Sequence, residues 1–383
     1  MSNNTTVLKS LTSHISRYDF QNSVELFDGD KKIRTLTTKN LFLGLVYAQV
    51  TKSFSLAELQ ASLIAHSSKL YHAGIKPIKK STFADALAKR NPKIFETIFL
   101  KLLDHAHSIY NGPRRYRSPL RVIDATTIDL CLSKYDWAKF RTTKGAIKLH
   151  ACFDPDSQLP NQVFLTEGNV HENNTLLAFT HDAQDIFVFD RGYNNYKSFY
   201  KLTLAGTTFI TRIKQNAQMK VVKKIDPADS TVISDVLGTF TGYKASKDYP
   251  MPIRVITYKD PESNKIYRFL TNNFEIDSIE VASIYKQRWQ IELFFKWIKQ
   301  NLKIKTFFGT SKNAVWSQIW VALIVHLLIW LTKALQGVQA SPQRMMQVLK
   351  GTLFEKKSIH ELFNPKIPDP PPDSGLPLFQ GRI

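Results

Sequence analysis

The stretch LRVIDATTIDLCL, residues 120–132, decides the fold, because it begins a series of segments with the composition of β-strands. It is rich in β-branched residues, which fit a pleated and half-buried surface. The segments AIKLHACFD (146–154) and QVFLTEG (162–168) have the same character, and the turn sequence DPDSQLP separates them. These three segments predict consecutive strands that pair as an antiparallel meander.

Further along the chain, strands alternate with helices. We expect a helix over 171–183, a short buried strand over 185–193 that ends in polar residues, a helix around YKSFYKLTLAG and a strand over 207–213. The predicted order is therefore β-β-β-α-β-α-β. Such an order is typical of an α/β domain.

Residues 1–117 are predicted to form an all-α domain instead. Ser55 and Glu58 have the spacing of a capping box at the start of the helix LAELQASLIAH. Ser81 can cap a second, short helix, TFADALAKR. Pro92 lies at the first turn of a third helix, KIFETIFLKLLDHAHSIY.

Four cations flank the short second helix, namely Lys79, Lys80, Lys89 and Arg90. A helix, a break and a second helix with a basic border resemble a helix-turn-helix, in which the second helix enters the major groove of DNA. On this interpretation the four side chains contact DNA. The alternative is a plain helical bundle with a solvated basic edge, and the long turn leaves both interpretations open.

Composition separates three further regions on the C-terminal side. Strand-like segments with turn signals between them indicate a β-rich insertion over 214–275. Residues 276–350 are helical, and 351–383 are a proline-rich C-terminal tail, of which we expect 363–383 to be disordered or loosely docked. The uncharged stretch 314–331 nearly reaches bilayer-spanning length. It is a single stretch with lysines on both sides, which favours a buried core helix over a membrane anchor.

The charge of the chain narrows the class of partner. Its 383 residues include 52 Lys plus Arg and 32 Asp plus Glu, a formal net charge of +20. This excess is typical of proteins that meet a polyanion, usually nucleic acid, although a merely basic soluble protein is the alternative. The two cysteines exclude a disulfide scaffold and a four-cysteine zinc site and fit a reducing compartment. The N-terminus lacks an apolar run of signal-peptide length, so no export is expected.

Two aspartates lie at strand positions where a carboxylate is unfavourable. Asp124 lies inside the first predicted strand, and Asp190 follows the apolar run IFVF. A buried carboxylate needs a cation, a hydrogen-bond donor or solvent to compensate for its lost hydration. A strand-end cap or a salt bridge would explain either aspartate alone, so neither is diagnostic by itself.

The helical segment after residue 278 carries a narrow polar stripe. At about 100° per residue, one side of the helix collects Tyr285, Arg288, Glu292 and Lys299, and the other side collects Ile291, Phe294, Trp297 and Ile298. An ion pair between Arg288 and Glu292, four residues apart, would explain two members of the stripe. It would not explain why a phenol and a further lysine share it.

Together, Asp124, Asp190 and Glu292 are the ligands that two-metal phosphoryl-transfer chemistry requires. Carboxylate oxygens suit Mg²⁺ or Mn²⁺. Two such ions, about 3.5–4 Å apart, activate an attacking oxygen and stabilise a leaving oxygen. Cations one helical turn away can hold the flanking phosphates.

With these residues identified, the sequence resembles the DDE transposases of bacterial insertion sequences, in the group with a Y-R-E-K signature. The resemblance covers about 118–335 and rests on Asp124, on Asp190 in FDRGY and on the spacing Tyr285-x2-Arg288-x3-Glu292-x6-Lys299. It implies an RNase H-like mixed sheet flanked by helices, built from 118–213 and 276–350 with 214–275 inserted. The helical region 1–117 resembles the DNA-binding domain that often precedes this catalytic domain.

The resemblance also implies a specific chemistry. Asp124, Asp190 and Glu292 would bind Mg²⁺ or Mn²⁺, and Tyr285, Arg288 and Lys299 would contact DNA phosphates near the cut. The enzyme would cleave the ends of an insertion sequence, and the freed 3′-hydroxyl would attack the target after a DNA hairpin intermediate. Expected partners are double-stranded DNA, at transposon ends and target, and a second copy of the chain on that DNA. No membrane is expected, and the location would be the cytoplasm, at the nucleoid.

Some roles stay open at this point. The family's hairpin mechanism uses an aromatic side chain to hold a flipped base; Trp289 lies near the polar stripe, but a half-buried core tryptophan is the simpler explanation. His171 and Arg191 are candidates for supporting the metal ligands. Two other functions are alternatives: a metal-dependent nuclease or recombinase without transposition, and a DNA-binding regulator derived from a transposase. The presence of all three carboxylates favours an active enzyme over the regulator.

Overall fold

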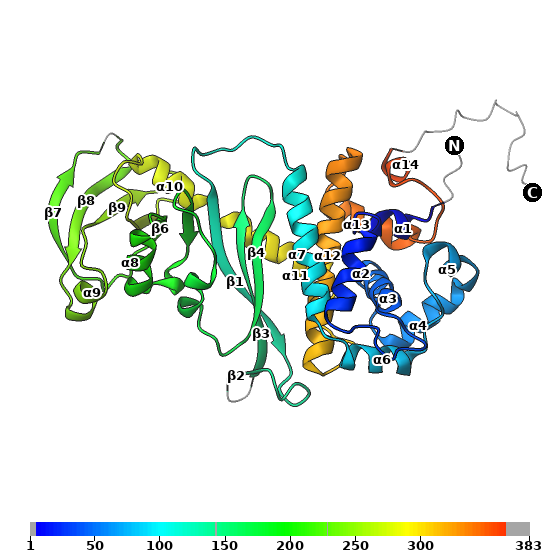
Figure 1. Cartoon of the computed structure of the whole chain (residues 1–383). Helices are drawn as coiled ribbons and strands as arrows, with labels where there is room; N and C mark the ends of the chain where they lie inside the picture. Colours follow the sequence, from blue (N-terminus) through cyan, green and yellow to red (C-terminus); the bar gives the residue numbers. More distant parts are fainter. Residues whose placement is uncertain (1–4, 142–143, 228, 365–383) are drawn as a thin grey trace, which may run out of the picture.

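One mixed sheet forms the left part of the molecule in Figure 1, and helices form the right part. The computed structural model describes residues 5–141, 144–227 and 229–364. Within these residues the strand order is β2-β3-β1-β5-β6-β10-β9-β8-β7, and β4 pairs with β3. The strands are β1 Leu120–Leu130, β2 Lys139–Arg141, β3 Lys144–Asp154, β4 Leu159–Glu167, β5 Ile186–Phe189, β6 Thr208–Arg212, β7 Met219–Ile225, β8 Val232–Phe240, β9 Ile253–Lys259 and β10 Ile266–Thr271. The predicted α/β class, with a mixed sheet flanked by helices, is confirmed.

The register of β1 positions the two strand aspartates. β1 pairs antiparallel with β3, and β3 with β4, which confirms the predicted meander. On its other side β1 pairs in parallel with β5, so that Ile123 lies opposite Phe189. Asp124 directly follows Ile123, and Asp190 directly follows Phe189. Parallel pairing therefore brings the two carboxylates to neighbouring positions although 66 positions separate them in sequence.

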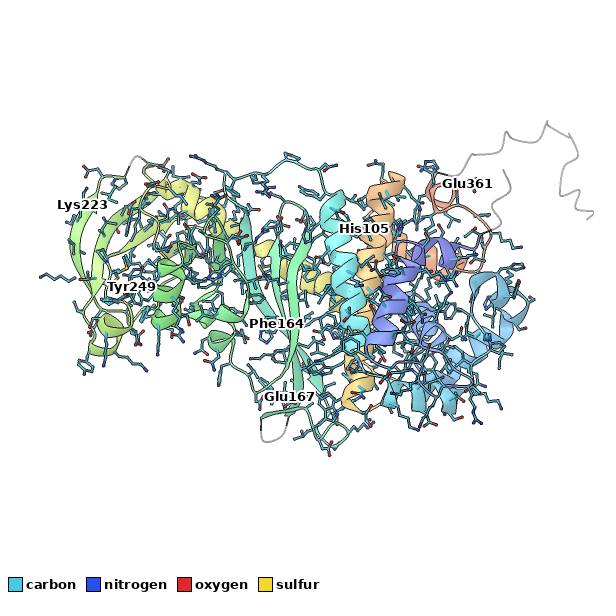
Figure 2. All side chains as sticks on the ribbon, in the orientation of Figure 1. His105, Phe164, Glu167, Lys223, Tyr249 and Glu361 are labelled. Atoms are coloured by element: carbon cyan, nitrogen blue, oxygen red, sulfur yellow. The ribbon has the colours of Figure 1, made fainter. Side chains whose placement is uncertain are left out.

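The strands of the predicted insertion continue this sheet. β10 pairs antiparallel with β6, and β9, β8 and β7 follow outward from it. Strand β7 and the short helix α9 (Tyr243–Asp248) were not expected from the sequence. In Figure 2, Lys223 lies on β7 at one end of the molecule, and Tyr249 lies next to α9.

Two hydrophobic clusters cover opposite faces of the sheet. On β1, Val122 belongs to the larger cluster, together with side chains from α10 (Ser278–Lys286) and α11 (Trp289–Asn301). Its neighbour Ile123 belongs to the smaller cluster, with side chains from α8 (Tyr196–Leu204). Because side chains alternate along a strand, Asp124 lies on the α11 side of the sheet.

The prediction of a helix over 171–183 is wrong. Two single 3-10 turns stand there, η1 (Glu172–Asn174) and η2 (Leu176–Ala178), and a third, η3 (Arg191–Tyr193), follows β5. Asn and Thr side chains compete with helical backbone hydrogen bonds. Thr175 does so here, because its Oγ1 donates a hydrogen bond to the carbonyl of Glu172 at 2.8 Å.

The long apolar stretch forms α12 (Lys312–Gln336), which is the central helix of the right half of Figure 1. It is long and apolar enough to cross a membrane, but 83% of its most apolar window is buried inside the protein. Helices α3 (Thr38–Thr51), α6 (Lys80–Lys89) and α7 (Lys93–Ile109) pack against it. The burial explains its apolar composition as that of a core helix.

The N-terminal region is helical, as predicted, and its other helices are α1 (Val7–Thr12), α2 (Arg17–Leu26), α4 (Leu56–Ala65) and α5 (Ser67–Ala73). Ser55 caps α4 by accepting a hydrogen bond from the N–H of Glu58, while the Glu58 carboxylate accepts from Phe54. The cap predicted at Ser81 is wrong, because α6 already begins at Lys80. Ser81 therefore lies inside the helix, and no side chain caps its first turn. Helix α5 occupies part of the expected break between α4 and α6.

The first part of the predicted tail is folded. Helix α13 (Pro342–Thr352) extends into it, and α14 (Ile359–Phe363) follows. The backbone N–H groups of Val7 and Leu8 donate hydrogen bonds to the carbonyls of Glu355 and Leu353. The first residues of the tail are therefore folded against α1, and the stretch expected to be disordered or loosely docked, 363–383, lies outside the described residues from position 365 on.

Candidate active site

Asp124 is a partly buried carboxylate in the middle of the sheet. Its Oδ1 accepts a hydrogen bond of 2.8 Å from the N–H of Ala125, and its side chain is 19% exposed. Burial raises its pKa to about 7. The carboxylates of Asp190 and Glu172 raise the pKa further, whereas the Ala125 N–H and the Arg288 guanidinium lower it. Asp124 thus lies close enough to Asp190 and Glu172 for their negative charges to raise its pKa, and the positive charge of Arg288 opposes this effect.

Asp190 is fixed at the point where β5 ends. Its Oδ1 accepts a hydrogen bond of 2.7 Å from the N–H of Gly192, which caps η3. Its backbone carbonyl accepts another from Thr211 Oγ1 on β6, at 3.2 Å. Strand pairing on both sides and the cap therefore set the direction of this carboxylate.

Arg288 joins the helical part of the site to the sheet. Its Nη1 lies 3.8 Å from Asp124 Oδ2, and its Nη2 forms an ion pair with Glu292 on the next turn of α11. The predicted continuous helix is interrupted here, since α10 ends at Lys286 and α11 begins at Trp289. Arg288 lies at this junction and bridges the two carboxylates.

Of the remaining members of the polar stripe, Tyr285 lies beside Arg288 and Lys299 lies elsewhere. Tyr285 is buried against Phe269, with ring centroids 4.9 Å apart, and burial raises its pKa, which Arg288 and Arg212 partly offset. Burial lowers the pKa of Lys299, and its charged neighbours are Asp129 and Lys305. Lys299 therefore does not join Asp124 in the described structure.

The structure adds residues that sequence reasoning missed. A Cβ at Gly192 would lie 2.9 Å from Asp190 Oδ1 and 3.2 Å from Glu172 Oε2, so both carboxylates border one small space. The hydroxyl of Tyr193 is buried nearby without a hydrogen-bond partner. The motif FDRGY contained part of this signal, since a glycine two residues after an aspartate permits close approach. Nothing local marked Glu172, whose place depends on the contact between η1 and η3.

The side chains gathered here carry the kind of ligand atoms that a divalent cation binds. Asp124, Asp190, Glu172 and Glu292 supply carboxylate oxygens, which hard cations prefer. A side chain at position 192 would collide with the Asp190 carboxylate, so glycine is needed for the close approach of this turn. Among the described residues, no three Asp, Glu, His or Cys side chains already converge as a bound metal requires. The Arg288 guanidinium pairs with the carboxylates of both Asp124 and Glu292.

Other sequence candidates surround this centre or lie far from it. His171 and Arg191 are exposed. Trp289 is 57% exposed, so the core explanation for it is wrong. It lines a cavity of about 460 Å³ whose other members include Arg212, Tyr258, Tyr267, Tyr285 and Arg288. An aromatic and largely cationic cavity thus adjoins Arg288, which pairs with Asp124 and Glu292.

The four N-terminal cations differ in their accessibility. Arg90 is buried, and its guanidinium donates hydrogen bonds to Thr38 Oγ1 and to the Leu36 carbonyl. It holds the helical domain together and cannot reach DNA, so the expectation for Arg90 is corrected. The side chains of Lys79, Lys80 and Lys89 are exposed.

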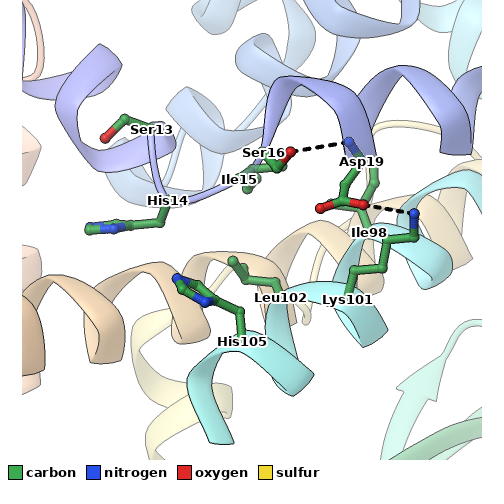
Figure 3. A pocket seen from close by; sticks show the side chains of 9 residues that line it. All are labelled: Ser13, His14, Ile15, Ser16, Asp19, Ile98, Lys101, Leu102 and His105. Carbon is green, nitrogen blue, oxygen red and sulfur yellow. Dashed lines mark hydrogen bonds and ion pairs between the residues drawn. The ribbon is translucent and has the colours of Figure 1, made fainter. Parts of the chain in front are cut away.

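A second cavity, of about 380 Å³, lies between the N-terminal helices (Figure 3). His14 and His105 point toward one another across it. Its carboxylate, Asp19, is neutralised by Lys101 at 2.9 Å. His14 Nε2 lies 3.0 Å from Thr332 Oγ1, which ties it to α12. This cavity lacks the group of acids found beside β1 and β5.

Comparisons with known proteins agree on one family. The profile described as a transposase DDE domain matches residues 115–328, and a domain of unknown function matches 3–76. A Sinorhizobium fredii protein whose name describes it as a transposase is 32% identical over 74% of this chain and 79% of its own length. A Geobacillus stearothermophilus protein, described as a probable transposase for insertion sequence element IS5377, is 33% identical over 57% of this chain and 58% of its own length. A Synechocystis protein named for insertion sequence element IS4SA is 24% identical over 83% and 88%.

Proposed function

Because the chain belongs to the transposase DDE domain family, whose catalytic domain is RNase H-like and uses divalent metal ions on DNA, we propose that it moves an insertion sequence. The proposed reaction is cleavage of DNA at the ends of the element and transfer of those ends to a target. The observation that carries the proposal is the register of β1 and β5, which makes Asp124 and Asp190 neighbours on the face covered by α11. Glu292 projects from that helix.

The proposed metal ligands are Asp124, Asp190 and Glu292, and the proposed ion is Mg²⁺ or Mn²⁺. When bound, such ions lower the barrier by activating the attacking oxygen and neutralising charge on the leaving oxygen. In the first step a water oxygen bonds to phosphorus and the bond to the 3′-oxygen breaks. The water's proton passes to solvent, and the leaving oxygen gains a proton as a 3′-hydroxyl.

In this proposal, Arg288 changes its ion-pair partners when DNA binds. It is paired with Asp124 and Glu292 in this structure. A DNA phosphate is a stronger bidentate acceptor for a guanidinium, so arriving DNA would draw Arg288 away and free both carboxylates. Tyr285 and Lys299 are proposed to contact phosphates on either side, although Lys299 would have to leave the vicinity of Asp129.

We assign the hairpin step to the cavity beside Arg288. A hairpin forms when the freed 3′-hydroxyl attacks the opposite strand, which releases a 3′-hydroxyl on the flanking DNA. The tight bend unstacks a base, and an unstacked base is stabilised on an aromatic face. Trp289, Tyr258 and Tyr267 line the cavity that could receive it.

The other parts of the chain would serve DNA binding. We propose that 1–117 bind the ends of the element, with Lys79, Lys80 and Lys89 as contacts, and that 118–213 with 276–350 catalyse the reaction. The strands of 214–275 extend the DNA-facing sheet. Both ends must be held together for transfer, which favours a homodimer on DNA, at the nucleoid in the cytoplasm.

Cleavage and binding of end-bearing DNA by single variants test the proposed function. D124N, D190N and E292Q should each abolish cleavage and leave DNA affinity largely unchanged, because affinity rests on the basic surfaces. E167Q is the matched control, since Glu167 is an exposed acid paired with Lys312. Wild-type protein that binds the ends without cutting them would favour the transposase-derived regulator.

Cleavage of DNA without any transfer to a target would favour a nuclease. Cleavage that persists in any of the three variants would contradict the assigned ligands. Circular dichroism of each variant excludes loss of folding as the cause.

A further inference from the structure

A cavity of about 490 Å³ lies within the region that matches a domain of unknown function. Its lining comes from α1, α2, α3 and the end of α5. Three of the lining side chains are cations from three different helices, namely Lys9, Arg17 and Lys39. The cavity adjoins that of Figure 3, with which it shares Ser13 and Ser16. The proposed function does not yet give it a role.

The acids near this cavity already have partners within the protein. Asp30 is the acid among the lining residues, and its Oδ1 accepts hydrogen bonds of 2.6 and 2.8 Å from the N–H and Oγ1 of Thr38. The other acids between residues 5 and 40 are engaged as well, in the pairs Asp19–Lys101 (Figure 3), Glu25–Gln21 and Asp28–Lys31. Lys9, Arg17 and Lys39 are exposed and have no ion-pair partner among the described residues.

Helix stability does not explain where two of these cations lie. Arg17 is the first residue of α2, and Lys39 is the second residue of α3. The N-terminal end of a helix carries a partial positive charge, which makes a cation there unfavourable. A local conflict without an internal compensation is expected at a binding site. The same partial charge favours an anion that arrives from outside the protein.

The rest of the lining is apolar and aromatic. It includes Phe20, Phe42 and Leu43, and the two phenylalanine rings have centroids 5.4 Å apart. Phe42 is buried, whereas Phe20 is half-buried at the cavity. Cations beside an apolar surface suit a ligand that joins an anionic group to an uncharged body. A DNA backbone has this character, because each phosphate is attached to a deoxyribose.

We propose that Lys9, Arg17 and Lys39 bind a phosphate of the DNA backbone at the ends of the element, and that the adjoining deoxyribose packs on Phe20 and Phe42. The domain matched over 3–76 would then hold DNA through this cavity. The inference rests on the proposed function, because the ligand is the DNA of the element. It names a contact separate from the lysines that flank α6.

The affinity of the full-length protein for end-bearing duplex DNA, measured by fluorescence anisotropy over a range of salt concentrations, tests the contact. A chelator in the buffer prevents cleavage. The variant K9Q/R17Q/K39Q should bind several-fold more weakly, and its salt dependence should flatten by about 0.9 in slope for each phosphate that it no longer neutralises. The charge-conserving variant K9R/R17K/K39R should retain the salt slope of the wild type.

A second triple variant provides the matched control. K31Q/K312Q/K357Q removes the same total charge, but each of these exposed lysines already pairs with an acid of the protein. Its DNA affinity and salt slope should stay close to those of the wild type. An equal loss in both triple variants would mean that only net charge matters, and it would overturn the inference.

Thermal unfolding separates DNA binding from a structural role and from binding of free phosphate. The Tm of K9Q/R17Q/K39Q should not fall, because two of the substitutions remove a cation from a helix N-terminus. A lower Tm with an unchanged salt slope would give the cations a structural role instead. If inorganic phosphate raises the Tm of the wild type but not of this variant, while both bind DNA equally, the cavity holds free phosphate and the inference is wrong.

The outcomes also separate the inference from the proposed function. If K9Q/R17Q/K39Q keeps the DNA affinity and salt slope of the wild type, and the wild type cleaves DNA once Mg²⁺ is added, the inference is wrong and the proposed function stands. If the variant loses DNA affinity as expected but the wild type never cleaves, the inference stands and the proposed function is wrong.

Discussion

Asp124 lies within strand β1, and the pKa of its carboxyl group is raised. Burial raises that pKa from an ordinary value of 3.8 to about 7. Between these values the unfolded chain has released the proton while the folded protein retains it, so folding stability falls as pH rises from about 4 to about 7. The whole effect is bounded by roughly 1.4 kcal/mol per pKa unit.

D124N should therefore become more stable than the wild type as the pH rises, in the absence of divalent cations. The free energy of unfolding, from urea titrations, should differ little at pH 4 and by as much as a few kcal/mol at pH 7.5 in favour of D124N. The reason is that asparagine has no proton to lose in the buried site. Stability curves that run parallel over this range would show that Asp124 is not desolvated as described.

The sequence alone selected Asp124, Asp190 and Glu292 as candidates, because charged residues at the ends of apolar strands and on a helix stripe leave a local pattern. It could not point to Glu172, or to the Tyr193 hydroxyl, which has no hydrogen-bond partner among the described residues. Their approach to the aspartates depends on the contact of two irregular turns, and no periodicity in the sequence predicts such a contact.

The helices α10 and α11 show what the stripe analysis could and could not predict at the scale of elements. The spacing of Arg288 and Glu292 survives in the structure as an ion pair. The break at the α10–α11 junction was not predictable, because the residues there are good helix formers. The break separates Tyr285, buried on the sheet, from Lys299, whose acidic neighbour is Asp129.

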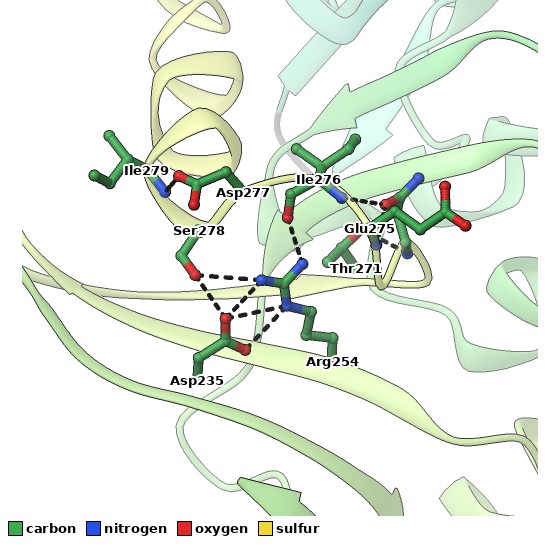
Figure 4. A network of polar contacts seen from close by, with 9 residues as sticks. Asp235, Arg254, Thr271, Glu275, Ile276, Asp277, Ser278 and Ile279 are labelled. Atoms are coloured by element: carbon green, nitrogen blue, oxygen red, sulfur yellow. Dashed lines mark hydrogen bonds and ion pairs between the residues drawn. The ribbon is translucent and has the colours of Figure 1, made fainter. Parts of the chain in front are cut away.

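A buried ion pair fixes the beginning of α10 (Figure 4). Asp235 on β8 is fully buried and receives Arg254 of β9 at 2.6 Å. Ser278, the first residue of α10, donates a hydrogen bond to the same carboxylate, and Arg254 also reaches the Ile276 carbonyl at 2.6 Å. Through this network the outer strands of the sheet hold the helix that carries Tyr285.

R254M should destabilise the protein by about 3–5 kcal/mol, because it leaves the Asp235 charge buried without its partner. E262Q is the matched control, since it removes an exposed pair with Lys286 and should change stability by less than about 1 kcal/mol. Urea denaturation measures both. Equal, small effects of the two substitutions would mean that the buried network does not anchor α10.

Across the whole molecule, α12 connects the N-terminal helices to the catalytic part. His326 of α12 is half-buried and packs against Phe294 and Trp297 of α11, at ring-centroid distances of 5.2 and 4.8 Å. Both of its ring nitrogens lack hydrogen-bond partners among the described residues. Burial lowers its pKa from 6.5 to about 4. Between these values the unfolded chain binds a proton that the folded protein does not, so stability is lost as pH falls from 6.5 to 4.

The substitution H326L should reduce the loss of folding stability at acidic pH. The difference in unfolding free energy between H326L and the wild type should shift in favour of H326L as pH falls from 7 to 4.5, by up to roughly 1.4 kcal/mol per pKa unit. Comparing the two proteins at each pH cancels the titration of other groups. A difference that stays constant with pH would contradict the burial of an uncharged imidazole at this junction.

The net charge of +20 leads to a prediction about DNA affinity. Replacing Lys79, Lys80 and Lys89 together by alanine should weaken binding to end-bearing DNA and flatten its dependence on salt, by about 0.9 in the slope for each DNA phosphate that the variant no longer neutralises. Lys357, which pairs with Glu355 at 3.4 Å, provides the control substitution. An unchanged slope in the triple variant would exclude this surface from DNA binding.

The most direct test of the central claim, that Asp190 is a metal ligand in DNA cleavage, exchanges its carboxylate for a thiolate. Mg²⁺ disfavours sulfur ligands, whereas Mn²⁺ accepts them better. In single-turnover assays on end-bearing DNA, D190C should be inactive with Mg²⁺ and regain cleavage with Mn²⁺, while the wild type cuts with either ion. Cleavage by D190C with Mg²⁺ at the wild-type rate would contradict the account.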